Sequence, residues 1–161
     1  MTRPLMLRLK WTLRAHGKQI VLVKRRAERP EHVLMKAFIW ALYLPVYPDV
    51  SVEVPVGDRY KPDVVSLDER GVPRFWGEAG EIGTAKIRSL IRRYPTTHLV
   101  IAKWDADLSP VAAIVTKALT GRTRVAPIDL LRFPADSDER FIDDRGVIRI
   151  TRQDIDGVSL P

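Results

Sequence analysis

Two acidic residues of this sequence, Asp63 and Glu78, could bind a cation together or share a proton. They stand at the two ends of a predicted strand hairpin over residues 63–78, whose middle is rich in turn-forming residues. If the turn is centred between Arg70 and Gly71, the carboxylates lie opposite each other on one face, with Cβ atoms roughly 5 Å apart. A register shift of one residue would separate them, so the prediction depends on the turn.

Two carboxylates this close repel each other, and a cation or a shared proton stabilises the pair. Mg²⁺ suits such a pair because it prefers oxygen ligands and often binds only one or two protein carboxylates together with waters and a substrate phosphate. A metal ion held in this way can activate water and stabilise charge on a phosphoryl oxygen. The hairpin therefore predicts a Mg²⁺ or Mn²⁺ site at Asp63 and Glu78. Alternatively, Asp63 is a turn residue that enters a strand, and Glu78 lies at a solvated strand end.

A lysine follows the hairpin at a position where a cation is unusual. Lys86 lies in the first turn of a helix predicted over residues 84–94, where the helix dipole disfavours a positive charge. The placement indicates an anionic neighbour, which could be the hairpin carboxylates, a phosphate or Glu81. A solvated helix residue would explain Lys86 equally well. The basic face of this helix is extended by Arg88, Arg92 and Arg93.

Charge favours a polyanionic partner such as nucleic acid. The 161 residues carry a net charge of +7, and the basic residues are concentrated in residues 1–36. Within that region the cluster Lys24, Arg25 and Arg26 is either a solvated strand end or a set of phosphate contacts.

Hydrophobic periodicity predicts the elements that must position these residues. The predicted strands are 5–13, 19–24, 50–56, 63–67, 74–78, 99–102 and 123–133, with a closing hairpin within 141–150; the predicted helices are 31–44, 84–94 and 110–119. This order indicates one α/β domain over residues 1–161, with a mixed central sheet flanked by helices.

The residues also resemble a known family. The resemblance rests on Pro62-Asp63, on the strand end Trp76-Gly77-Glu78-Ala79-Gly80, on Lys86 in the next helix, and on Glu31 nine residues before Trp40. This pattern resembles the PD-(D/E)XK nuclease-like superfamily, and most closely its YaeQ-type branch. The resemblance covers roughly residues 5–120.

The resemblance implies a restriction-endonuclease-like core and a divalent-metal phosphodiesterase activity on nucleic acid. Asp63 and Glu78 would bind the metal, and Lys86 would orient water or stabilise the transition state. Glu31 would support the metal site from its helix. A structural explanation of Glu31 also exists, because a carboxylate in a first helical turn is favourable by about 0.3–1 kcal/mol.

One position departs from the motif. The lysine expected two residues after Glu78 is replaced by Gly80, so Lys86 or Arg88 would have to serve. Arg88 could stabilise charge but could not act as a base. The alternative hypothesis is therefore a catalytically inactive nuclease-fold module that binds nucleic acid or a protein partner.

Composition excludes several other classes of protein and site. Cysteine is absent, which excludes disulfides and thiolate metal sites, and no apolar run approaches the roughly 20 residues needed to cross a membrane. A cytoplasmic protein is therefore expected. Structural or surface roles are expected for His16, His32 and His98, and core positions are expected for Trp11, Trp40, Trp76 and Trp104.

Overall fold

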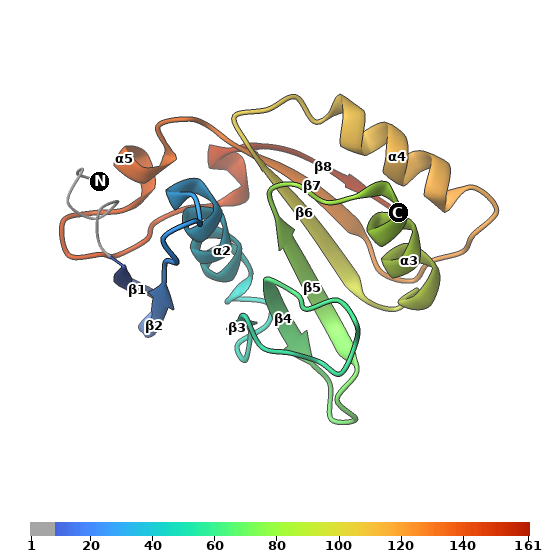
Figure 1. The fold of residues 1–161 in the computed structure, drawn as a ribbon, viewed down its shortest axis with the longest axis horizontal. Helices are drawn as coiled ribbons and strands as arrows, with labels where there is room; N and C mark the ends of the chain where they lie inside the picture. The colour runs from blue at the N-terminus through green and yellow to red at the C-terminus, as the bar shows by residue number, and fades with distance from the viewer. Residues whose placement is uncertain (1–8) are drawn as a thin grey trace.

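A computed structural model describes residues 9–161, and its centre is a six-stranded mixed sheet (Figure 1). The strand order is β3-β4-β5-β6-β7-β8, in which β5, β6 and β7 run parallel and the other neighbours are antiparallel. The strands are β3 (Ser51–Val52), β4 (Val64–Leu67), β5 (Pro73–Ala79), β6 (His98–Trp104), β7 (Ile128–Phe133) and β8 (Asp156–Leu160).

Helices cover both faces of this sheet (Figure 1). On one face, α2 (Pro30–Tyr43) packs together with a separate hairpin of β1 (Lys10–Ala15) and β2 (Lys18–Val23). On the other face lie α3 (Thr84–Arg93) and α4 (Ser109–Leu119), which form the crossovers between the parallel strands. The short segments α5 (Ser137–Phe141) and η1 (Arg152–Asp154) precede β8.

The buried helix α2 approaches the sheet closely at Gly77, in the middle of β5. A Cβ atom at this position would lie 3.0 Å from Ile39 Cγ2 and 3.3 Å from Val64 Cβ. A glycine between Trp76 and Glu78 therefore allows α2 to pack directly on the strand that carries the candidate site.

Most of the predicted elements are confirmed, including the mixed sheet and the helices flanking it. The strand predicted over 50–56 is too long, because only Ser51–Val52 pairs with β4 and the chain then leaves the sheet at Glu53. The strand predicted over 123–133 begins only at Ile128, after Pro127. Residues 5–8 of the first predicted strand lie outside the described residues.

Three elements near the C-terminus, α5, η1 and β8, were not predicted. The hairpin expected within 141–150 is reduced to one bridge between Ile142 and Ile148, and the helix α5 precedes it. The edge strand β8 was missed because its DGVSL sequence is polar and mostly exposed, without the alternation that marks a half-buried strand. None of the helices within residues 9–161 is long and apolar enough to cross a membrane.

Candidate active site

The hairpin of β4 and β5 places Asp63 and Glu78 on the same face of the sheet. Val64 pairs with Gly77, and the N–H of Asp63 donates to the carbonyl of Gly77 at 3.1 Å, so the register continues to Asp63 opposite Glu78. The turn is centred on Arg70, half a residue before the predicted centre between Arg70 and Gly71. A bulge between Ser66 and Leu67 restores the predicted register at the site.

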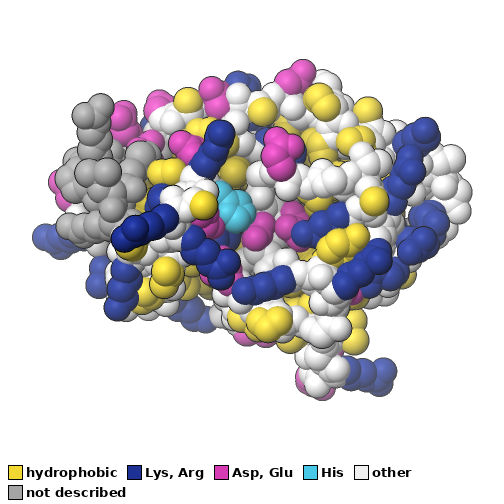
Figure 2. Space-filling view, in the orientation of Figure 1, with side chains coloured by type: hydrophobic (Ala, Val, Ile, Leu, Met, Phe, Trp, Pro, Cys, Tyr) yellow, Lys and Arg dark blue, Asp and Glu magenta, His cyan; other side chains and the backbone are white. Residues whose placement is uncertain are grey.

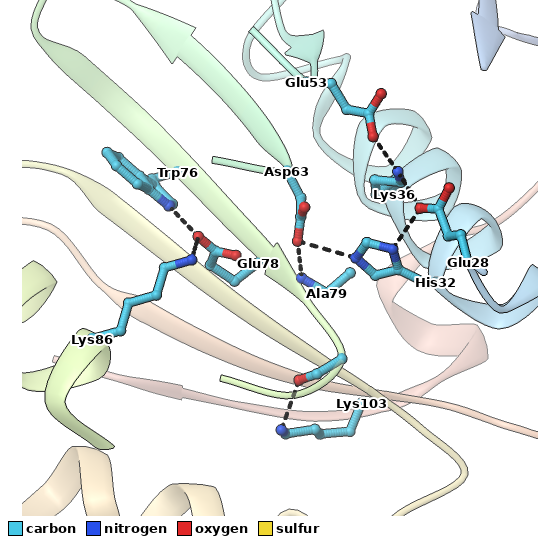
Figure 3. Close-up of polar contacts among 11 residues, drawn as sticks. Glu28, His32, Lys36, Glu53, Asp63, Trp76, Glu78, Ala79, Lys86 and Lys103 are labelled. Carbon is cyan, nitrogen blue, oxygen red and sulfur yellow. Dashed lines mark hydrogen bonds and ion pairs between the residues drawn. The ribbon is translucent and has the colours of Figure 1, made fainter. Parts of the chain in front are cut away.

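Glu78 is buried at the carboxyl end of β5, with only 6% of its surface exposed. Its Oε1 accepts a hydrogen bond from Trp76 Nε1 at 2.9 Å and lies 2.8 Å from Lys86 Nζ (Figure 3). Burial and the neighbouring charge of Asp63 nevertheless raise the pKa of Glu78 to about 7. Glu78 therefore binds a proton more readily than an ordinary glutamate, although two donors hold its carboxylate.

The pKa of Asp63 is shifted in the opposite direction. Burial alone would raise its pKa, but hydrogen bonds from His32 and from the backbone N–H of Ala79 lower it. The Ala79 N–H lies 2.8 Å from Asp63 Oδ2, and His32 Nε2 lies 3.5 Å from the same oxygen (Figure 3). The pair therefore combines an ionised aspartate with a glutamate that binds a proton readily.

His32 reaches the carboxylate pair from the first turn of α2. Its hydrogen bond with Asp63 raises the pKa of His32, although burial alone would lower it. Its other ring nitrogen, Nδ1, lies 2.7 Å from Glu28 Oε2. With a carboxylate at each nitrogen, the doubly protonated ring is favoured, and it fixes Asp63 from the side opposite Glu78 (Figure 3).

A buried lysine anchors this arrangement. Lys36 is 1% exposed, and its Nζ contacts both Glu53 and, at 2.8 Å, Glu28. Glu53 adopts a left-handed backbone with φ +58°, a strained conformation for a residue with a side chain. The chain of contacts Glu53–Lys36–Glu28–His32–Asp63 thus connects β3, α2 and the start of β4, as Figure 3 shows.

Lys86 extends from α3 toward Glu78 beneath an aromatic ring. Its Nζ lies 5.2 Å from the centre of the Tyr60 ring, in the loop that precedes Asp63. That loop is tied to α3 because Asp58 contacts Arg93 and accepts a hydrogen bond from the Tyr94 hydroxyl. The anionic neighbour predicted for Lys86 is therefore Glu78, and the loop holds the ammonium group in place.

The structure does not bring every predicted site residue to this centre. Arg88 is exposed, and Glu31 lies at the cleft described below, outside the set of residues that contact Asp63 or Glu78. Arg93 is engaged by Asp58 and Ser89, whereas Arg92 is exposed. Of the basic cluster, Arg26 is exposed, Lys24 donates to the carbonyl of Arg25, and Arg25 reaches the cleft at Asp63.

Gly80, which stands where the motif has lysine, has a backbone that suits glycine. Its φ is +84°, a conformation in which a side chain is strained. Lys103 from β6 donates to the Gly80 carbonyl at 2.8 Å, so this backbone is also held in place (Figure 3). The lysine beside the carboxylates therefore comes from α3.

Sequence reasoning missed His32, Glu28, Lys36 and Glu53. A structural or surface role was expected for His32, and the structure adds a contact between its ring and Asp63. One signal was present, because Glu28, His32 and Lys36 follow each other at intervals of four, the spacing of one helix face. Their contact with residue 63 depends on tertiary packing, which the spacing does not reveal.

The candidate site offers two carboxylates, fewer ligands than a site that surrounds a metal ion with protein side chains alone. Among residues 9–161, no three His, Cys, Asp or Glu side chains are grouped to hold a metal ion. Oε1 of Glu78 and Oδ2 of Asp63 accept from the donors described above, and the two carboxyl groups also interact with each other. A pair of carboxylates could hold Mg²⁺ or Mn²⁺, which retain waters and accept substrate oxygens.

Comparison with known proteins gives a fold and no sequence match. No protein-family model and no curated protein matches the sequence. The crystal structure of the YaeQ protein from Pseudomonas syringae superposes with a TM-score of 0.61 and 14% identity, covering 88% of this chain and 80% of that chain. The chain has a YaeQ-like fold.

A second solved structure agrees with the first. The YaeQ protein from Xanthomonas axonopodis pv. citri gives a TM-score of 0.54 at 13% identity, over 93% of this chain and 92% of that one. At these identities the likeness concerns the fold alone. In the YaeQ-like fold of this chain, the carboxylate pair lies where α3, the β4–β5 hairpin and the start of α2 meet (Figure 3).

Proposed function

We propose that this protein is a divalent-metal-dependent phosphodiesterase that acts on nucleic acid in the cytoplasm, built on a restriction-endonuclease-like core of the PD-(D/E)XK type. One observation carries the proposal: Lys86 Nζ lies 2.8 Å from the carboxylate of Glu78, which interacts in turn with Asp63. Two carboxylates and an ammonium group thus lie near one another, an arrangement that supports hydrolysis of a phosphodiester with a bound metal ion.

Each residue has a distinct role in this proposal. Asp63 and Glu78 would hold Mg²⁺ or Mn²⁺, which supplies an activated water and charge stabilisation at the phosphate when it is bound. Lys86 would orient the attacking water or neutralise a phosphoryl oxygen beside Glu78. His32 would keep Asp63 ionised and correctly oriented from the opposite side.

Basic side chains lie close to Asp63 on the molecular surface. Figure 2 shows Lys and Arg side chains on both sides of the acidic and histidine side chains at the centre of this face. A cleft of about 410 Å³, here named the Asp63 cleft, is lined by residues that include Arg25, Glu28, His32, Lys61 and Asp63. Arg25 and Lys61 are placed to neutralise phosphates next to the one that is cleaved.

A cleavage assay tests the proposal. Labelled single-stranded and duplex DNA and RNA are incubated with the protein and Mg²⁺ or Mn²⁺, and cleavage is expected to disappear with EDTA and in Glu78→Gln and Glu78→Ala proteins. Glu69→Gln, an exposed carboxylate on the β4–β5 turn, is the matched control and should cleave normally. Cleavage that persists in the Glu78→Ala protein would overturn the assignment of that residue.

A non-catalytic binding module is the second candidate function, and Gly80 favours it, because the motif lysine is absent there. This alternative predicts binding of nucleic acid whose log affinity falls linearly with log salt concentration, without cleavage at any metal concentration. Failure to bind DNA or RNA at low salt would count against both candidates.

A further inference from the structure

A second cleft opens beside the candidate active site, where the ends of β5 and β6 meet the start of α2. It shares Glu28 and His32 with the Asp63 cleft, has a volume of about 680 Å³ and is here named the Trp104 cleft after the aromatic residue in its wall. This volume lies within the range typical of sites for small organic ligands. Because the two clefts meet at His32, a ligand bound at Asp63 can extend directly into the Trp104 cleft.

Trp104 differs from the other tryptophans of the chain. The core position predicted for Trp11, Trp40 and Trp76 is confirmed, since each is at most 2% exposed. Trp104 is instead only partly buried: it packs against the core and also lines the cleft. An indole held in this way is a preformed surface on which a flat ring can stack.

The lining of the Trp104 cleft sets the carboxylates of Glu31 and Glu81 against one exposed guanidinium, that of Arg29, so it suits a ring with hydrogen-bond donors better than a phosphate. Met35 adds a second apolar, polarisable surface, while Glu31 and Glu81 provide acceptors for N–H groups. Lys103 faces the same cleft, but its ammonium group is already bonded to the Gly80 carbonyl. Phosphate groups are better matched by Arg25 and Lys61 in the Asp63 cleft.

We propose that the Trp104 cleft binds one unpaired nucleobase, stacked on Trp104, of the strand whose phosphate lies at Asp63 and Glu78. The inference rests on the proposed function and deepens it, because it names the class of substrate. A base that is paired and stacked within a duplex cannot reach the indole in the cleft, so the substrate is single-stranded or has an extruded base. Glu31 acquires a role as a base-contacting residue instead of a support for the metal.

Tryptophan fluorescence tests this proposal without requiring catalysis. The protein is titrated in EDTA with an eight-nucleotide single-stranded DNA, with an abasic strand of the same length, and with a blunt duplex. The single strand is expected to quench the emission of Trp104, and this quenching should disappear in the Trp104→Phe protein, whose other tryptophans are buried. The abasic strand and the duplex are expected to leave that emission unchanged.

Affinity gives a second, independent readout. Trp104→Ala is expected to weaken binding of the single strand by about fivefold or more, whereas Trp104→Phe retains a stacking ring and should bind nearly as well as wild type. Equal affinity for the normal and abasic strands, or unchanged affinity in Trp104→Ala, would overturn the proposal. Because no metal is present, base binding without any later cleavage would support the Trp104 cleft and contradict only the proposed activity.

Discussion

Replacing Lys86 with methionine is expected to lower the rate of metal-dependent cleavage by about 10²- to 10⁴-fold, the usual contribution of one positioned proton-transfer or charge-stabilising group. The reason is geometric, because Lys86 Nζ lies 2.8 Å from Glu78 and 5.2 Å from the centre of the Tyr60 ring. Single-turnover cleavage measured with saturating protein would report this loss separately from any change in binding.

The control for this variant is Lys117→Met, which removes an exposed lysine from α4 by the same substitution. Cleavage by the control should equal that of wild type. Lys86→Arg is expected to restore only part of the rate, because a planar guanidinium is not equivalent to an ammonium group against a single carboxylate oxygen. A Lys86→Met rate within about threefold of wild type would show that the ammonium group has no part in the chemical step.

Replacing Lys36 with methionine is expected to lower the free energy of unfolding by about 1.5–3 kcal/mol, because the change leaves the partly buried Glu28 and Glu53 carboxylates without their counter-charge. Hydrogen bonds with Glu28 and Glu53 raise the pKa of Lys36 although burial alone would lower it, so the ammonium group is charged in the folded protein. Urea unfolding monitored by circular dichroism would measure the loss.

Lys117→Met serves again as the control and should change stability by no more than about 0.5 kcal/mol. A loss below about 1 kcal/mol in Lys36→Met would mean that water replaces the lysine, and that the chain of contacts from Glu53 to Asp63 does not hold His32. The folded Lys36→Met protein should also show a higher pKa for His32, because the positive charge of Lys36, which lowers that pKa, is removed.

The pairing of Asp63 with Glu78 could be predicted because it depends on local properties. Alternating strands and a Gly-containing turn define the hairpin, and the bulge after Ser66 compensates for the half-residue error in the turn centre. Lys86 could be predicted for a similar reason, since a cation in a first helical turn indicates an anionic partner. The contact of Lys86 with Glu78 could not be predicted, because it depends on where α3 packs relative to β5.

The support of the site could not be predicted, because it depends on contacts between distant segments. Lys36 occupies a position typical of a helix interior, and its contacts with Glu28 and with Glu53, seventeen residues away, explain a buried ammonium group. Trp104 gave no signal either, because a tryptophan at a strand end is compatible with the core and with a cleft wall. Its exposure is decided by where α2 begins relative to β6.

Titration with Mn²⁺ by isothermal calorimetry tests most directly whether Asp63 and Glu78 form a cation site. One site per chain is expected, weakened by more than about tenfold in Glu78→Gln and in Asp63→Asn, with Glu69→Gln as the unchanged control. Because the pKa of Glu78 is raised to about 7, a proton competes with the metal below that pH, and affinity should be about tenfold weaker at pH 6 than at pH 8. Equal Mn²⁺ affinity in wild type and both carboxylate variants would show that Asp63 and Glu78 do not form a cation site.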